Sequence, residues 1–154
     1  MRDRTVELHA GDKAYEPLTS DLFEIKSGGM GPCFGVIIFD AIDRSTHAAH
    51  FYAPNKNDLR ELQSWLQSSF ASFSMSLNVR VYVGGCCCDD SKTSKRVAKA
   101  ARKLIEREIN SFAPPTANRE FKWPADDIRI TELTLDAQSG TCTAAFYRHD
   151  DVAL

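Results

Sequence analysis

Short runs in which apolar residues cluster or alternate with polar ones predict most of the strands of this chain. The clearest runs cover residues 34–41 and 45–52, which a three-residue link joins as an antiparallel pair. Pro54 ends the second run because proline has no N–H for a sheet. Further strands are predicted at residues 6–10, 22–26, 78–85, 128–135 and 141–148, the last two joined by a hairpin turn at 136–140.

Two longer segments instead repeat their apolar residues three and four positions apart. The first predicts a helix over about residues 59–73, capped by Asn57 or Asp58. The second predicts a helix over 94–110. Its expected core stripe consists of Val97, Ala101, Leu104 and Ile105. This order of elements predicts an α+β domain, with mostly antiparallel or mixed sheets covered by two long helices.

Composition adds limits rather than a function. With 154 residues, 43% of them apolar and 26% charged, the chain suits one soluble domain spanning residues 1–154. A formal net charge of -2 gives no reason to expect nucleic acid as a partner. No apolar run reaches the roughly 20 residues of a membrane helix, so no membrane insertion is expected. The first residues lack a secretory h-region, so we expect a cytoplasmic protein, or one exported without a signal peptide.

The cysteines suggest a reducing compartment and no metal. Five are present, three of them consecutive, and none forms a CxxC pair, so neither a disulfide framework nor zinc is expected. The run Cys86-Cys87-Cys88 is interpreted first as small residues at a strand end beneath a helix. The alternative is a thiol that resolves an oxidised Cys33.

The chemistry of the chain centres on a glycine turn and the two strands after it. Ser27-Gly28-Gly29-Met30-Gly31-Pro32-Cys33 leads directly into the strand at 34–41, and His50 lies near the end of the next strand. If the strands pair, Cys33 and His50 can meet, and a thiol beside an imidazole is an acyl-transfer nucleophile. Alone, either residue would more often be a packed core residue. The open backbone of the turn favours a functional role, because packing does not require it.

Two other features have more than one interpretation. His47 points to the opposite face of its strand from His50, which argues against a shared metal. The second helix is rich in basic residues between Lys92 and Arg107. The simpler interpretation is a solvated face, and the alternative is a docking surface for an acidic partner.

Taken together, these motifs resemble the CheD family of chemoreceptor glutamine deamidases. That family has a threonine, then Leu-Gly-Ser-Cys, then Asn-His-Phe-x-x-Pro at the same Cys-to-His interval. In this chain, Met30-Gly31-Pro32-Cys33 matches the first of these motifs, and His50-Phe51-Tyr52-Ala53-Pro54 matches the second from its histidine onward. The strand end Val81-Tyr82-Val83-Gly84-Gly85 and the closing hairpin are also similar. The likeness extends over nearly the whole chain and implies a CheD-like layered sandwich.

The resemblance implies a role for each matching residue. Cys33 falls on the nucleophile, His50 on its general base, and Ser27 on a threonine that orients the histidine. The oxyanion would be held by backbone N–H groups of the turn, from Gly28, Gly29, Gly31 and Cys33. The implied activity is cofactor-free hydrolysis of a glutamine side-chain amide in a protein substrate through a thioester. Glutamyl methylesterase activity would use the same groups. Serine at 27 keeps the family's hydroxyl, while Pro32 removes one backbone N–H.

Three other functions are compatible with the same residues. Deamidase toxins of the cytotoxic necrotising kind share the Cys–His arrangement, so the protein could be a secreted effector rather than a chemotaxis enzyme. A catalytically inactive, CheD-like binding module would keep the fold alone. A cysteine protease is less compatible, because papain-like enzymes place the histidine far downstream of the cysteine.

Overall fold

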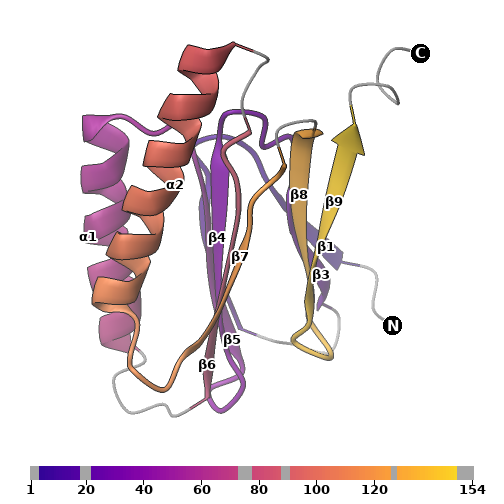
Figure 1. The fold of residues 1–154 in the computed structure, drawn as a ribbon. Helices are drawn as coiled ribbons and strands as arrows, with labels where there is room; N and C mark the ends of the chain where they lie inside the picture. Colours follow the sequence, from indigo (N-terminus) through magenta and orange to yellow (C-terminus); the bar gives the residue numbers. More distant parts are fainter. Residues whose placement is uncertain (1–3, 18–21, 73–77, 88–90, 126–127, 149–154) are drawn as a thin grey trace.

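The computed structural model describes residues 4–17, 22–72, 78–87, 91–125 and 128–148 of the chain, and these form three layers. Two helices form the first layer, a five-stranded sheet lies in the middle, and a four-stranded sheet forms the third (Figure 1). Both sheets are mixed, so the expected α+β class is confirmed.

The middle sheet carries the strand pair that the sequence singled out. Its order is β2-β5-β4-β6-β7, antiparallel except for the parallel pair β6–β7. Its strands are β2 (Lys13–Pro17), β4 (Phe34–Asp40), β5 (Ser45–Phe51), β6 (Val79–Gly85) and β7 (Asn118–Lys122). The predicted pairing of β4 with β5 is confirmed, and Gly35 lies directly opposite His50. Strand β4 is buried along its whole length, which suits its apolar sequence.

The second sheet packs on the face of the middle sheet that is turned away from the helices. Its order is β1-β3-β8-β9, with β1 parallel to β3 and the other pairs antiparallel. Its strands are β1 (Arg4–Leu8), β3 (Leu22–Ser27), β8 (Ile128–Asp136) and β9 (Cys142–Arg148). Side chains alternate in strands, so Ile37 and Tyr82 meet this sheet, while Val36 and Val83 meet the helices.

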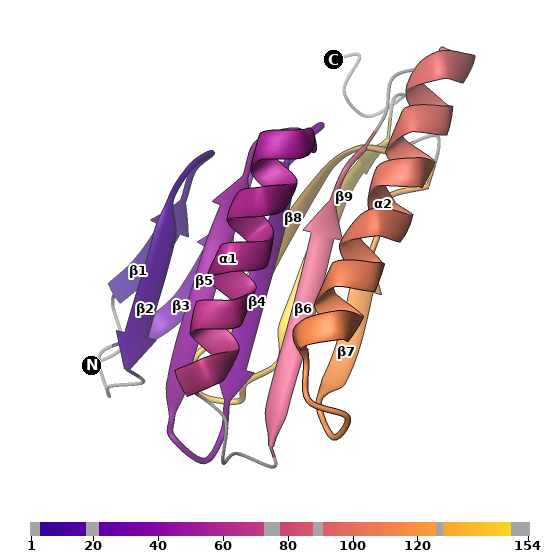
Figure 2. The ribbon, with the colours of Figure 1, turned by 90° about the vertical axis from the view of Figure 1, so that its left-hand side faces the viewer.

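The two helices cover only the other face of the middle sheet. Helix α1 (Lys56–Ser72) lies over β5 and β4, and α2 (Lys92–Phe112) lies over β6 and β7 (Figure 2). The oxygen of the Asn55 side chain accepts hydrogen bonds from the N–H groups of Asn57 and Asp58, so Asn55 caps α1. No helix in the described part of the chain is long and apolar enough to cross a membrane.

The structure corrects several details of the sequence-based prediction. Strands β2 and β7 were not predicted, because each is a short, largely polar edge strand without a clear apolar period. The predicted caps Asn57 and Asp58 are wrong, since Asn55 fills that role. The predicted core position Val97 is also wrong: its side chain is 59% exposed. The first turns of α2 project beyond the arrowhead of β6, and the core of the helix is formed by Ala101, Ile105 and Ile109 (Figure 2).

Candidate active site

His50 lies between the two sheets and is held firmly by its backbone. Its side chain is only 2% exposed, and it is paired with Gly35 on the neighbouring strand β4. The turn between β1 and β2 fixes it from the other side. Gly11 donates its N–H to the His50 carbonyl at 2.8 Å, and the His50 N–H donates to the carbonyl of Asp12 at 2.9 Å. The imidazole is therefore presented by rigid backbone, as precise chemistry requires.

The contacts of the ring define which nitrogen carries the proton. Nδ1 lies 3.2 Å from the carbonyl oxygen of Leu8 and 3.1 Å from Oγ of Ser27. A carbonyl can only accept, so the neutral ring must donate from Nδ1. The Ser27 hydroxyl in turn donates to Sδ of Met30 at 3.4 Å, which leaves its oxygen free to accept from the same Nδ1–H. Hydrogen-bond logic thus assigns the lone pair to Nε2.

Ser27 reaches His50 only because Gly35 lacks a side chain. Ser27 ends β3 in the other sheet and is fully buried. A Cβ at Gly35 would lie 2.6 Å from Oγ of Ser27 and 2.7 Å from Sδ of Met30. Such distances are shorter than van der Waals contact, so a side chain at this position would displace the serine. The structure therefore brings together two of the three expected catalytic residues, Ser27 and His50.

The second ring nitrogen is prepared to act as a base. Nε2 of His50 is buried and has no hydrogen-bond partner among the described residues. Burial lowers the pKa of His50, and the hydrogen bond to Leu8 offsets this only in part. The ring is therefore neutral at pH 7, with an unused lone pair. Such an unsatisfied buried atom is costly in a purely structural histidine.

Cys33 stands one residue before β4, where three segments meet. Its carbonyl accepts the N–H of Cys86 at 2.8 Å, and its sulfur receives a hydrogen bond from the N–H of Ala53. Gly85, with a φ of 107°, allows β6 to pack this closely, because a Cβ there would lie 2.8 Å from Cα of Phe34. Cys33 is half-buried and forms no disulfide.

The protonation state of the Cys33 thiol at rest follows from its surroundings. Burial raises the pKa of Cys33, the Ala53 N–H lowers it, and the Asp58 carboxylate raises it. No hydrogen bond joins Nε2 of His50 to a described residue, Cys33 included. The register places Gly35 opposite His50, and Cys33 lies two residues before Gly35 and one residue before β4 begins. The thiol is therefore protonated at rest, not a preformed thiolate–imidazolium pair.

Backbone hydrogen bonds fix the glycine turn at two points. The carbonyl of Gly31 accepts the N–H of Cys87 at 2.8 Å, and the turn is further tied by the Met30 N–H, which donates to Thr131 at 3.4 Å. Gly29 adopts a φ of 65° and has nothing within 4 Å of a notional Cβ. The backbone at this point is consequently open to a ligand.

The other cysteines have structural surroundings. Cys86 is buried in the core beneath α2, and burial raises its pKa to about 12. Burial also raises the pKa of Cys142 to about 12. Cys87 is half-buried, and Cys88 lies outside the described residues. Among the residues that the structure describes, no group of three or more His, Cys, Asp or Glu side chains could hold a metal ion.

The basic face of α2 is less uniform than its sequence suggests. Arg102 points inward, and its Nε and Nη2 donate to the Cys86 carbonyl at 3.0 and 2.6 Å. It therefore fixes the end of β6 rather than facing solvent. Several other basic side chains of the helix are exposed: Lys92, Arg96, Lys99, Lys103 and Arg107.

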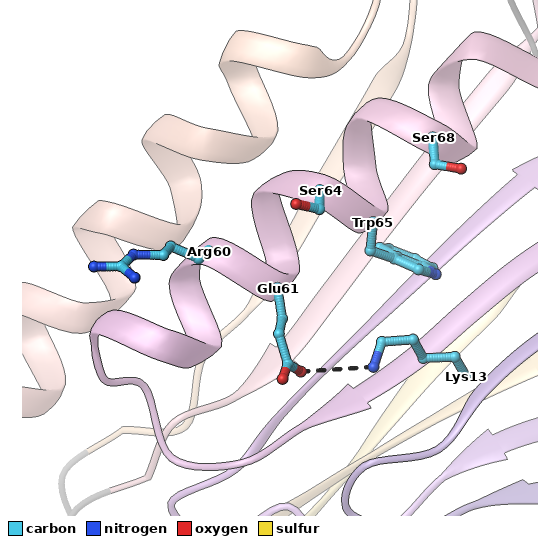
Figure 3. Close-up of a pocket in the computed structure, with 6 residues that line it drawn as sticks. All are labelled: Lys13, Arg60, Glu61, Ser64, Trp65 and Ser68. Carbon is cyan, nitrogen blue, oxygen red and sulfur yellow. Dashed lines mark ion pairs between the residues drawn. The ribbon is translucent and has the colours of Figure 1, made fainter.

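Pockets flank the turn and the helices. One of about 270 Å³ lies against Gly28 and Gly29, with Glu7, Lys26 and Glu132 in its wall. Another, of about 470 Å³, lies between α1 and the edge strand β2 (Figure 3). There Lys13 and Glu61 form an ion pair at 3.7 Å, and Trp65 forms part of the wall. Among the described residues, none that lines the groove in Figure 3 is a cysteine or histidine, so the groove is separate from Cys33 and His50.

Sequence reasoning missed three contributors to this site. The Leu8 carbonyl and the Ala53 N–H are backbone groups, which no residue pattern reveals. Gly35 could have been noticed as a glycine inside a strand, a known sign of close approach by another group.

No protein-family model matches the chain, and no match was found among curated proteins.

Proposed function

We propose that this protein is a cysteine-dependent deamidase that hydrolyses glutamine side-chain amides in protein substrates. The observation that carries the proposal is the state of His50: Nδ1–H is held by Leu8 and Ser27, and the Nε2 lone pair is buried and unused. This is the tautomer that a general base toward a neighbouring thiol needs. The layering of two helices on one sheet, backed by a second sheet, is compatible with the CheD-like sandwich that the sequence resembles.

The reaction begins with a neutral thiol. The proposal requires Sγ of Cys33 to approach Nε2 of His50 from a chain position two residues before Gly35, the residue that pairs with His50. Nε2 of His50 takes the proton from Sγ of Cys33 as the sulfur attacks the amide carbon. The N–H of Cys33 and a second N–H of the glycine turn hold the oxyanion.

Breakdown of the intermediate returns the enzyme to its starting state. The protonated His50 gives its proton to the leaving nitrogen, which departs as ammonia and leaves a thioester on Cys33. His50 then removes a proton from water as the water oxygen attacks the thioester carbon. The carbon–sulfur bond breaks, His50 returns the proton to the sulfur, and the glutamate product and the free thiol are formed. Apart from the substrate and water, every group in this cycle belongs to the chain. A glutamyl methyl ester would react by the same steps, with methanol as the leaving group.

The raised pKa of Cys33 favours a second candidate, a binding module that has kept the fold without the chemistry. One experiment separates the two. Wild-type protein and a Cys33→Ala variant are incubated with bacterial lysates, and glutamine-to-glutamate conversions are mapped by mass spectrometry. Conversions produced by the wild type alone support the deamidase. Equal partner capture by both proteins, with no conversion and no ammonia from either, would favour the binding module.

A further inference from the structure

A small pocket lies directly beside Cys33, between the strand ends and α2. Its volume is about 120 Å³, well below the roughly 300–1,000 Å³ of sites for whole small molecules. A pocket of this size fits one side chain. It is lined by Pro32, Ala53, Pro54, Cys86, Cys87, Ser94, Val97, Ala98 and Ala101.

Cys33 is not itself among the lining residues, but three of them adjoin it. Pro32 directly precedes Cys33, and Ala53 donates the N–H that bonds to the sulfur. Cys86 donates its N–H to the Cys33 carbonyl at 2.8 Å. A substrate side chain in this pocket would therefore lie next to the thiol, on the same polypeptide as the amide under attack.

The lining selects for apolar occupants. None of these lining residues carries a charge, so an ammonium or carboxylate would lose its hydration there without gaining a partner. Val97, one of the lining residues, is 59% exposed, so an apolar side chain is left in water at this pocket. The first turns of α2, which begins at Lys92, project beyond the arrowhead of β6 (Figure 2).

The geometry points to a specificity pocket that receives an aliphatic side chain of the substrate, from a residue close to the target glutamine. This inference rests on the proposed function, since it assigns the pocket to the substrate of Cys33. It commits to a valine-, leucine- or methionine-sized side chain, because the pocket is apolar and too small for a larger ligand.

The test uses two alkylating reagents with the same reactive group. Iodoacetamide has no apolar arm, whereas N-isobutyl iodoacetamide carries an aliphatic arm that the pocket can bind. Ala98→Leu fills the pocket from α2. Ala100→Leu is the matched control, since Ala100 is exposed on the same helix and is not part of the lining. Rates of modification at Cys33 are measured by peptide mass spectrometry, after thermal unfolding has confirmed that both variants fold.

In the wild type we expect the isobutyl reagent to modify Cys33 about tenfold faster than iodoacetamide, a typical discrimination by an apolar pocket. Ala98→Leu should remove this preference and leave the iodoacetamide rate within about twofold. Ala100→Leu should keep it. An equal preference in wild type and Ala98→Leu, or no preference in the wild type, would overturn the inference.

The same measurements separate failure of the pocket from failure of the proposed function. In one outcome, the wild type prefers the isobutyl reagent, Ala98→Leu abolishes the preference, and no substrate releases ammonia. This outcome would refute the deamidase and support the pocket as a binding site for an aliphatic group. Deamidation without any reagent preference would retain the enzyme and refute the pocket. Absence of Cys33 labelling by either reagent would refute both.

Discussion

Replacing Ser27 with alanine tests the assignment of His50 more directly than any other single change. The hydroxyl is one of two acceptors of the Nδ1–H bond, and the Leu8 carbonyl is the other. Removal of the hydroxyl leaves Nδ1–H with a partner, so no buried donor is orphaned and the tautomer is retained. What is lost is part of the orientation of the ring toward Cys33.

The expected magnitude follows from that remaining partner. A neutral hydrogen bond contributes about 0.5–1.5 kcal/mol, which corresponds to a rate lowered about 2- to 13-fold. Loss of the base itself in His50→Ala should cost about 100-fold or more, the usual contribution of general base catalysis. Ser27→Ala should therefore act as a partial defect, with both the nucleophile and the base in place.

Alkylation of Cys33 by iodoacetamide at pH 7.5 measures this effect without a known substrate, and ammonia release repeats the test once a substrate is found. Ser69→Ala is the matched control. Ser69 is also buried and lies 3.2 Å from a histidine Nδ1, but that histidine is His47, on the helix side of the sheet. The rate of Cys33 alkylation in Ser69→Ala should equal the wild-type rate. A Ser27→Ala rate equal to that of Ser69→Ala would refute the positioning role. A loss as large as that of His50→Ala would show that the Leu8 carbonyl does not hold the ring.

Three further predictions follow from the same geometry. Gly35→Ala should slow Cys33 alkylation at least as much as loss of the serine hydroxyl, because its methyl group occupies the hydroxyl's place; an unchanged rate would contradict this. Burial lowers the pKa values of both His50 and His47, so the unfolded chain binds protons first as pH falls below about 6.5. The contribution of these histidines to the free energy of unfolding should therefore be complete above that pH. As the pH is lowered further, the free energy of unfolding should decrease by at most about 1.4 kcal/mol per pH unit for each histidine; thermal unfolding between pH 7.5 and 5.5 checks the sign. Iodoacetamide should modify Cys33 well before Cys142, whose pKa burial raises to about 12, and peptide mapping that finds Cys142 first would contradict the assignment.

The sequence by itself determined the central strand pair and the residues that it presents. A short link between two apolar runs leaves few registers, and alternation then decides which side chains share a face. That reasoning correctly placed His50 and His47 on opposite faces, with His50 beside the strand that follows Cys33. The same local periodicity predicted both helices and the α+β class, because amphipathic patterns reflect burial on one side.

Only the tertiary structure decided what surrounds those residues. Ser27 meets His50 from a different sheet, and the Leu8 carbonyl and the Ala53 N–H act through backbone atoms that every residue possesses. Val97 has the spacing of a core residue, yet its side chain is exposed. A periodic pattern records the direction in which a side chain points. Whether another layer of the protein lies there depends on packing between segments that are distant in the sequence.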